Sequence, residues 1–578
     1  WELDDEAMDV LVINLMEEKK PDAPMVRVRV SGKSLYPLSI SLAAKLAKEF
    51  DGRLRISYSG GADYYNIERI VDAGIWPVTV ATTLLKPGGY QRLTQMAKLL
   101  DKENAPFEKV NAESAGKLAE EAVKDPHHVK AMKPLPSRKM KKEVPLMDCF
   151  VAPCKEGCPI HQDITTYLQL VGEEKYEEAM EVITEKNPLP FITGTICAHN
   201  CMSKCTRNFY ETPVHIREMK LKAAENGYEA LLEKLPVPAV TKAGKAAVIG
   251  GGPAGMAAAY FLRKGGMEVT LFEAKESLGG VVRHVIPPFR ISEDAIEKDA
   301  EILRKMQVDI HCNTKLESLE ELKKQGYTKI VLAVGAPVQG SLKLESGMPK
   351  NALEFLAEFK QTDGKVSLGK HVVVIGGGNT AMDTARAAKR NAGVEHVYLI
   401  YRRTRRYMPA DEEELVMALE DGVEFKELLS PVKLENGQLF CKVMQLSDYD
   451  VSGRRGVTET GETVWVPADT VIAAVGEKVP TDWYQANGLA VSEKGRLYVD
   501  EKTLKTSDDN VYAAGDGLYG PATVVEAIRD GRKVAEAIAG EVLACDFDKL
   551  AEEEKVYAKR GVLKEEQKET KEAGRCLG

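Results

Sequence analysis

The sequence predicts an α/β protein of several domains, and three observations predict it. Two strand–glycine loop–helix units begin about 125 residues apart, at Gly250 and Gly376. Six of the ten cysteines lie between Cys149 and Cys205, among segments with helical periodicity. The first 110 residues alternate short apolar runs with amphipathic segments, which is typical of repeated βα units. At 578 residues the chain is long enough for about three or four separate cores.

The composition is that of a globular protein and argues against nucleic-acid-binding, membrane-spanning and disulfide-rich secreted proteins. The chain is 44% hydrophobic and 29% charged, which is ordinary for a globular protein, and its net charge of −9 gives no support to nucleic-acid binding. No run is apolar for long enough to cross a bilayer, and no signal peptide is visible. The scattered Cys312, Cys441, Cys545 and Cys576 do not resemble a disulfide framework, so we expect a cytoplasmic location. Because the chain opens on Trp1, we expect it to be part of a longer protein.

Changes in periodicity and composition divide the chain into parts. The first part has a predicted strand at 53–58, a helix at 64–73 and a strand at 76–81. A polar, proline-bearing linker follows, and a charged helical tail closes the chain. The predicted divisions are residues 1–110, 111–145 (linker), 146–240 (cysteine-rich helices), 241–338 with 482–545, 339–481, and 546–578 (tail).

The first glycine loop follows the apolar strand at 246–249 and opens an alanine-rich helix. In its G-x-G-x-x-G pattern Gly250 allows a tight turn, Gly252 lets a pyrophosphate approach the backbone, and Gly255 permits close helix–strand packing. The next strand ends in Glu273, where a carboxylate accepts hydrogen bonds from ribose hydroxyls. A glycine pattern alone also arises by chance in loops, but this context favours a dinucleotide site.

The second loop repeats the pattern, with Ala381 in the third glycine position. Its second strand, 396–401, is followed not by an acid but by four arginines within five residues, Arg402, Arg403, Arg405 and Arg406. A carboxylate would repel a ribose 2′-phosphate, whereas guanidinium groups pair with it, so the site favours NADPH, with NADH as the alternative. A solvated basic turn is the plainer interpretation of the arginines. The predicted contacts are Gly376, Gly378, Asn379, Thr380, Arg402, Arg403 and Arg406.

Two loops in one chain imply two dinucleotides, the arrangement of a flavin disulfide-reductase-like pair of Rossmann-type domains. Residues 510–517 match the late flavin motif, whose Asp516 holds the ribityl chain, and the helix after it would direct its N-terminus at the flavin. Because this motif follows the second loop, the FAD domain (241–338 and 482–545) must be split around the NADPH domain (339–481). Neither domain contains Cys-x-x-Cys, so electrons must leave the flavin without a redox disulfide. The predicted FAD contacts are Gly250, Gly252, Gly255, Glu273, Gly280, Gly515, Asp516 and Thr523.

The clustered cysteines form two groups of three. A structural zinc site uses two pairs with no surplus, so six thiolates fit one zinc ion badly, although zinc and free thiols remain alternatives. If the second group lay on one helix, its outer cysteines would be roughly 12 Å apart and would serve two centres. Two cubane clusters need eight ligands, which leaves two places for other residues. The groups are Cys149, Cys154 and Cys158, then Cys197, Cys201 and Cys205.

With these motifs, residues 146–545 resemble the small subunit of glutamate synthase and the N-terminal electron-transfer half of dihydropyrimidine dehydrogenase. The resemblance implies two [4Fe-4S] clusters held in residues 146–240. Leu146 stands where those families have a further cysteine, so one cluster is expected to be atypical. The resemblance implies one cluster on Cys149, Cys154 and Cys205, and the other on Cys158, Cys197 and Cys201.

The resemblance also suggests non-cysteine ligands. Asp148 is the oxygen ligand nearest to the missing cysteine. For the other cluster the families use a Gln or Glu that aligns best with Lys220, but a protonated lysine has no lone pair, so Glu218 is the candidate. For the first cluster, His161 and His199 are alternatives to Asp148 that could ligate as neutral imidazoles or simply lie beside the cluster.

The start of the chain has a narrower resemblance. Residues 57–61 and 74–90 resemble the last two βα units of a dihydroorotate-dehydrogenase-like TIM barrel, so residues 1–110 are expected to form a partial barrel; a small α/β cap is the alternative. The order of domains is most similar to the selenate reductase iron–sulfur subunit family. In that family a ferredoxin-like domain follows, and Cys576 resembles its first cysteine.

The predicted function is that of an NADPH-oxidising flavo-iron–sulfur oxidoreductase. A hydride would pass from NADPH to FAD, and single electrons would leave through the clusters, without a general acid or base from the protein. The acceptor would be a partner subunit or attached domain, such as a molybdenum hydroxylase or a ferredoxin-like protein. The alternatives are reverse or bifurcating reduction of NADP⁺ by ferredoxin, and a non-catalytic scaffold, against which the intact FAD motifs argue. The sequence does not specify the terminal substrate.

Overall fold

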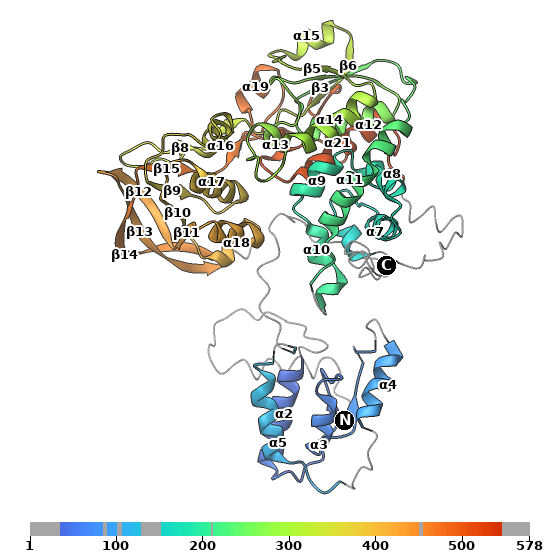
Figure 1. Ribbon diagram of the computed structural model, residues 1–578, viewed down its shortest axis with the longest axis vertical. Coiled ribbons are helices and arrows are strands. Elements are labelled where there is room, and N and C mark those ends of the chain that lie inside the picture. Colours follow the sequence, from blue (N-terminus) through green and yellow to red (C-terminus); the bar gives the residue numbers. More distant parts are fainter. Residues whose placement is uncertain are drawn as a thin grey trace. The chain divides into compact units, whose positions relative to one another are not determined.

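The computed structural model describes residues 35–81, 83–84, 89–100, 107–125, 127–128, 152–209, 212–449 and 455–545. The chain forms two compact units, Trp1–Pro134 and Leu135–Gly578 (Figure 1). Some predictions lie outside the described residues, namely those on Leu146, Asp148, Cys149, Cys576 and the tail helix within 546–578.

The first unit packs its helices against a short parallel pair of strands. Strand β1 pairs with β2 through Tyr58 opposite Val78, and buried side chains such as Ile40 and Ile70 form the core. The strand predicted at 53–58 is wrong over most of its length, because pairing begins only at Tyr58 and the one described neighbour, β2, is two residues long. The elements are α2 (Tyr36–Glu49), β1 (Tyr58–Ser59), α3 (Ile67–Asp72), β2 (Val78–Thr79), α4 (Gly89–Leu99) and α5 (Ala112–Ala122).

The second unit begins with the cysteine-bearing helices. The long helix α11 packs on α7, α8 and α9. Gly227 allows a close approach, since a Cβ there would lie 2.3 Å from the carbonyl oxygen of Tyr176. Its elements are α6 (Pro153–Glu156), α7 (Ile164–Gly172), α8 (Tyr176–Lys186), α9 (Pro190–Ile196), α10 (Asn200–Lys204), η3 (Thr206–Phe209) and α11 (Ile216–Lys234).

The first sheet of this unit has five strands in the order β17-β6-β3-β4-β5, all parallel. The chain therefore returns to this sheet only after completing the second one. Helices α12 and α21 pack on each other beside this sheet (Figure 1). The close approach is possible because Gly531 has no side chain, since a Cβ there would lie 2.6 Å from the carbonyl oxygen of Ala254. Its elements are β3 (Lys245–Ile249), α12 (Pro253–Lys264), β4 (Glu268–Phe272), α13 (Val281–His284), α14 (Glu293–Lys305), β5 (Asp309–His311), α15 (Leu319–Lys324), β6 (Tyr327–Leu332), α19 (Thr481–Ala486), β17 (Val511–Ala513), α20 (Asp516–Tyr519) and α21 (Val524–Ala539).

The second sheet is also parallel, in the order β11-β10-β9-β15-β8. Its central strand β9 contains Val372, Val373 and Val374, all 0% exposed, as expected for a strand covered on both faces. Its elements are β8 (Lys350–Asn351), α16 (Ala352–Gln361), β9 (His371–Ile375), α17 (Asn379–Arg390), β10 (His396–Tyr401), η4 (Arg405–Tyr407), α18 (Glu412–Glu420), β11 (Glu424–Glu427) and β15 (Thr470–Ala473).

Two small antiparallel sheets complete the unit. The three-stranded sheet β12-β13-β14 is formed by the part of the sequence between β11 and β15, and it projects beside the second sheet (Figure 1). The pair β7 and β16 lies where the chain passes into and out of the second domain. The strands are β7 (Val338–Gln339), β12 (Leu429–Glu435), β13 (Gln438–Tyr449), β14 (Arg455–Pro467) and β16 (Glu477–Lys478).

Candidate dinucleotide and iron–sulfur sites

The first glycine loop leaves no space for side chains at its turn. Gly250 has φ +105°, and a Cβ there would lie 2.3 Å from the carbonyl oxygen of Ala333 in the neighbouring chain segment. A Cβ on Gly255 would lie 1.8 Å from the carbonyl oxygen of Gly250. The tight turn and the close helix packing expected from the motif are therefore both present.

A second loop closes on this turn from the other side. A Cβ on Gly280 would lie 2.8 Å from the Cα of Gly252, and the Gly279 N–H donates to the carbonyl of Gly251 at 2.8 Å. Gly252 is also the N-cap of α12, so backbone N–H groups of the first helical turn point into this space. A cradle lined by backbone at a helix N-terminus fits a pyrophosphate.

Glu273 holds its carboxylate beside the cradle. It is 7% exposed, and its Oε2 accepts the Gly251 N–H at 2.6 Å while its Oε1 accepts the Lys275 N–H at 2.8 Å. Each oxygen keeps a further lone pair, so the carboxylate can still accept a hydroxyl. The placement fits the ribose contact predicted from the sequence.

The late flavin motif, residues 510–517, lies against the start of α12, beside the first glycine loop. A Cβ on Gly515 (φ +69°) would lie 2.7 Å from the Cβ of Ala254, at the start of α12. Asp516 Oδ1 accepts the Ala522 N–H at 3.0 Å, and burial raises the pKa of this carboxyl to about 6. Thr523 caps α21 in a reciprocal capping box with Glu526. The positive end of a 16-residue helix thus lies beside a carboxylate that can accept hydroxyl hydrogens.

The second glycine loop is covered by the segment that follows β10. Asn379 Nδ2 donates to Asp411 at 3.2 Å and its Oδ1 accepts the Asp411 N–H at 3.0 Å. The Ala410 N–H donates to the carbonyl of Gly377 at 2.9 Å. Sequence reasoning missed Asp411, which carries no motif, because this contact depends on how the loop folds back.

The predicted arginines divide into two kinds. Arg402 and Arg406 are exposed, in the segment after β10 that lies between Tyr401 and Ala410, both of which contact Gly377. Arg403 is 8% exposed, and its Nε donates to the carbonyl of Arg455 in β14 at 2.8 Å. Arg405 pairs with Glu412 at 2.9 Å. The structure therefore directs Arg403 toward the inserted sheet and leaves Arg402 and Arg406 at the surface.

Five of the six clustered cysteines are described, and they converge from several short elements. Cys154 lies in α6 and Cys201 in α10, two helices that pack on each other. Cys197 and Cys205 have extended backbones, with ψ of 138° and 130°, at the ends of α9 and α10. The assumption that one helix carries the second group is wrong, because the chain turns at both of these cysteines, so the 12 Å separation does not apply.

Four of the five described thiols share one buried environment, and Cys205 is partly exposed. Burial raises the pKa of Cys158 and of Cys201, neighbouring thiols raise it further, and the charge of Lys220 lowers it. Burial also raises the pKa of Tyr167, and the cysteines around it add to this. Buried, mutually coupled thiols are ionised most readily by binding metal, which fits an iron–sulfur centre. The four cysteines that act on Tyr167 are Cys154, Cys158, Cys197 and Cys201.

The described thiols do not have the spacing of a mononuclear site. Within the described ranges, the one group of three ligand atoms that lie within 4.8 Å of one another is formed by Asp63, His127 and His128, with no cysteine. Four ligands of a single zinc ion at about 2.3 Å would lie closer together than that. A multi-iron cluster accommodates the wider spacing.

The structure places the candidate non-cysteine ligands differently from one another. Glu218 is exposed and lies 3.2 Å from His215. Lys220 is 8% exposed, and its charge lowers the pKa of the Cys158 thiol. His161 lies 3.7 Å from Glu156, and His199 lies 3.1 Å from Arg217. Burial lowers the pKa of both histidines, so both are neutral imidazoles near pH 7.

A buried charge network beside Cys158 was missed from the sequence. Lys155 and Lys186 bind the fully buried Asp163 at 2.7 and 2.6 Å, and Lys186 also donates to the carbonyl of His161. Such a network stiffens the turn that follows Cys158 and leaves net positive charge next to the thiols. No sequence signal distinguishes these lysines from surface lysines.

Known proteins match each part of the chain. The family models described as "Oxidoreductase YgfK, N-terminal TIM-barrel domain", "Dihydropyrimidine dehydrogenase domain II, 4Fe-4S cluster" and "Pyridine nucleotide-disulphide oxidoreductase" match residues 9–130, 135–230 and 244–531. The small chain of NADPH glutamate synthase from Azospirillum brasilense is 33% identical over 68% of this chain and 86% of its own length. The chain belongs to the glutamate synthase small-chain family.

Two further relatives extend this result. The PreT subunit of NAD-dependent dihydropyrimidine dehydrogenase from Escherichia coli K12 is 31% identical over 68% of this chain and 91% of its own. Oxidoreductase YgfK of the same organism is 41% identical over 89% of this chain, and the chain spans 50% of its length. The predicted family resemblance, the Rossmann-type pair, the iron–sulfur domain and the TIM-barrel segment are thereby confirmed.

The domains are those of flavin-, nicotinamide- and iron–sulfur-dependent oxidoreductases. Among the described residues, no helix has the length and apolar character needed to cross a membrane.

Proposed function

We propose that this chain is an NADPH-oxidising electron-transfer module. FAD would occupy the cradle at Gly252 and Gly280, and NADPH the loop at Gly376. When bound, the flavin supplies hydride acceptance and the iron–sulfur clusters carry single electrons onward. The chain's own residues bind, orient and electrostatically tune these groups, and no side chain is needed as a proton donor.

One contact carries the proposal, because it connects the flavin side to the thiols. Helix α21 begins after Thr523, beside Asp516, and Arg532 lies nine residues later, roughly 14 Å along the axis. The Arg532 Nη1 donates to the carbonyl of Ile160 at 3.2 Å, two residues after Cys158. The proposed flavin site and the turn after Cys158 are thus joined through the first half of α21, which supports an electron path between them.

Six cysteines would hold two [4Fe-4S] clusters, with the division of ligands that the family resemblance implies. Lys220 supports the proposal as a buried positive charge beside Cys158 and Cys201, where it would offset the charge of a thiolate-bound cluster. Its position on α11 would also bring it close to the place that a Gln or Glu ligand takes in relatives, so one cluster would lack a protein oxygen ligand there.

A partner subunit or an attached domain would take the electrons. Two of the relatives are named as a small chain and a subunit, and this chain spans half of YgfK. A molybdenum hydroxylase or a ferredoxin-like acceptor fits the single-electron chemistry of such a module.

The nicotinamide specificity can be tested at the two exposed arginines. Arg402→Ala with Arg406→Ala should raise the Kd for NADPH roughly 100-fold or more, because the double variant removes two charge-assisted hydrogen bonds, each worth about 1.5–3 kcal/mol. The Kd for NADH should change less than threefold. Arg405→Ala is the matched control, since this exposed arginine already pairs with Glu412. Equal losses for both nucleotides would refute the 2′-phosphate contact.

The clusters can be tested by composition. Protein purified without oxygen should contain about eight iron and eight sulfide per FAD, the content of two cubanes. Cys201→Ser should lower the iron content and alter the electron paramagnetic resonance spectrum of the reduced protein while FAD remains bound. Iron-free protein with zinc bound to the cysteines would overturn the proposal.

A further inference from the structure

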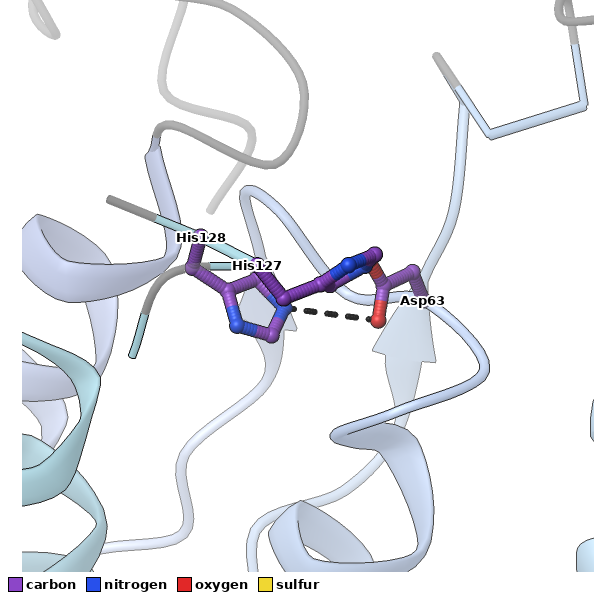
Figure 2. Close-up of side chains that lie close together, drawn as sticks. All are labelled: Asp63, His127 and His128. Atoms are coloured by element: carbon purple, nitrogen blue, oxygen red, sulfur yellow. Dashed lines mark hydrogen bonds and ion pairs between the residues drawn. The ribbon is translucent and has the colours of Figure 1, made fainter. Parts of the chain in front are cut away.

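Three side chains of the first unit converge on one point (Figure 2). Asp63 Oδ2 lies 3.1 Å from His127 Nε2, and Asp63 Oδ1 lies 3.4 Å from His128 Nε2. One ligand atom from each residue lies within 4.8 Å of those of the other two. The histidines are more than 60 residues from Asp63 in sequence, so the fold brings them together.

His128 is held in the orientation and tautomer that a metal ligand needs. Its Nδ1 lies 2.7 Å from Asp125 Oδ2 and donates to it, which leaves the lone pair on Nε2 directed at the cluster. Asn66 fixes this assignment independently: its Oδ1 accepts the Asp63 N–H at 2.8 Å, so its Nδ2 faces His128 Nε2 at 3.0 Å as a donor. A carboxylate on the far nitrogen of a histidine is the usual support for a metal-bound imidazole.

We propose that Asp63, His127 and His128 bind one divalent transition-metal ion of the zinc class. Ligands held about 2.1 Å from an ion at tetrahedral or octahedral angles lie roughly 3.0–3.4 Å from one another. Each imidazole nitrogen lies in this range from one of the two Asp63 oxygens, at 3.1 Å for His127 and 3.4 Å for His128, so the carboxylate faces both rings. Two imidazoles and one carboxylate form a mixed nitrogen–oxygen set that suits such an ion better than Mg²⁺ or Ca²⁺.

The surroundings fit a bound cation. Asp63 and Asp125 place two carboxylates around His128, which is 1% exposed at its side chain. The Asp63 carboxylate is fixed by the Tyr65 N–H at 2.9 Å, so little ordering is required on binding. The Asn66 amide would yield its contact with His128 to the ion and retain its bond to the carbonyl of Gly61 at 3.0 Å.

The site is open on one side. The His127 side chain is 34% exposed and lies against the exposed ring of Tyr65, 4.0 Å between ring centroids. Asp63 follows β1, at the carboxyl end of the parallel pair, which is the edge where TIM barrels place their functional residues. Three protein ligands at an open edge leave a coordination position for water or a substrate oxygen.

The alternative is a metal-free ion-pair network, and zinc binding separates the two. The whole chain, with its flavin and clusters, would be dialysed against buffered Zn²⁺ and its zinc content measured. We expect one zinc per chain, with X-ray absorption showing only nitrogen and oxygen ligands at about 2.0–2.1 Å. No bound zinc, or zinc with sulfur ligands, would overturn the proposal.

Three variants test the assignment. His127→Gln should weaken zinc binding at least 100-fold. Asp125→Asn removes the carboxylate behind His128, while its amide oxygen can still accept the His127 N–H, so it should weaken zinc binding about 10- to 100-fold with unchanged ligand types. His311→Gln is the matched control, an exposed histidine that contacts a single carboxylate, Asp309, at 2.9 Å. Because His127 is partly exposed, its replacement should leave the fold intact. Unchanged zinc binding in His127→Gln would overturn the proposal.

Discussion

The two glycine loops share one backbone design. In the first, the Gly250 N–H donates to the carbonyl of Phe272 at 2.8 Å, and in the second the Gly376 N–H donates to the carbonyl of Ile400 at 3.1 Å. The strands before each loop pair in the same register with the strands that follow. The backbone alone therefore does not decide which dinucleotide each loop binds.

The difference lies in the residue that follows the second strand. Glu273 and Tyr401 occupy equivalent positions, and each lies against the middle glycine of its loop. Glu273 offers a carboxylate, whereas the Tyr401 ring fills the space below Gly377 and its hydroxyl donates to the carbonyl of Tyr407 at 2.8 Å. The first basic residue comes one position later, at the surface. One position in a shared design thus separates the proposed ribose acceptor from the proposed phosphate-binding surface.

The third position of the motif gives the largest expected difference between the loops. Gly255→Ala should abolish FAD binding and destabilise the protein by about 3 kcal/mol or more, because a Cβ would lie 1.8 Å from the backbone. Ala381→Gly in the second loop should cost only about 0.5–1 kcal/mol of helix stability and leave FAD bound. Flavin absorbance and denaturant unfolding would measure both. FAD retained by Gly255→Ala would break the comparison.

In the first, flavin-side loop region, Asp516 should make the stability of the protein depend on pH. Because burial raises the pKa of its carboxyl to about 6, the folded state holds this proton more tightly than the unfolded state. Stability is therefore lost as pH rises from about 4 through 6. Asp516→Asn should raise the free energy of unfolding of flavin-free protein by up to about 3 kcal/mol at pH 7 and by little at pH 4. An equal gain at both values would contradict this cause.

The smallest effects are expected at the equivalent pair itself. Glu273→Gln replaces one acceptor by a donor that would face a backbone N–H, so FAD should bind roughly 5- to 150-fold more weakly, equivalent to about 1–3 kcal/mol. Tyr401→Phe removes one hydrogen bond and should cost about 0.5–1.5 kcal/mol of stability, with FAD binding unchanged. Titrations with FAD would measure the binding of both variants, and denaturant unfolding would measure the stability of Tyr401→Phe.

The glycine motifs could be predicted because their constraints are local. Gly250, Gly255 and Gly280 are required by backbone contacts that any strand–loop–helix unit of this kind makes. The roles of the arginines could not be separated in the same way. Arg403 differs from Arg402 only in being directed into β14, which is distant in sequence. Likewise Lys220 and Glu218 lie two residues apart on α11, and only helix packing buries one and exposes the other.

By itself the sequence determined the number and order of the domains' characteristic motifs, since turn chemistry, strand periodicity and thiol spacing are properties of short segments. Only the tertiary structure decided which polar side chains act together. The joining of Arg532 to the turn after Cys158, and of Asp63 to two histidines far along the chain, depends on packing between segments. The physical reason is that hydrogen bonds and metal–ligand bonds act over about 2–3 Å, whatever the separation in sequence.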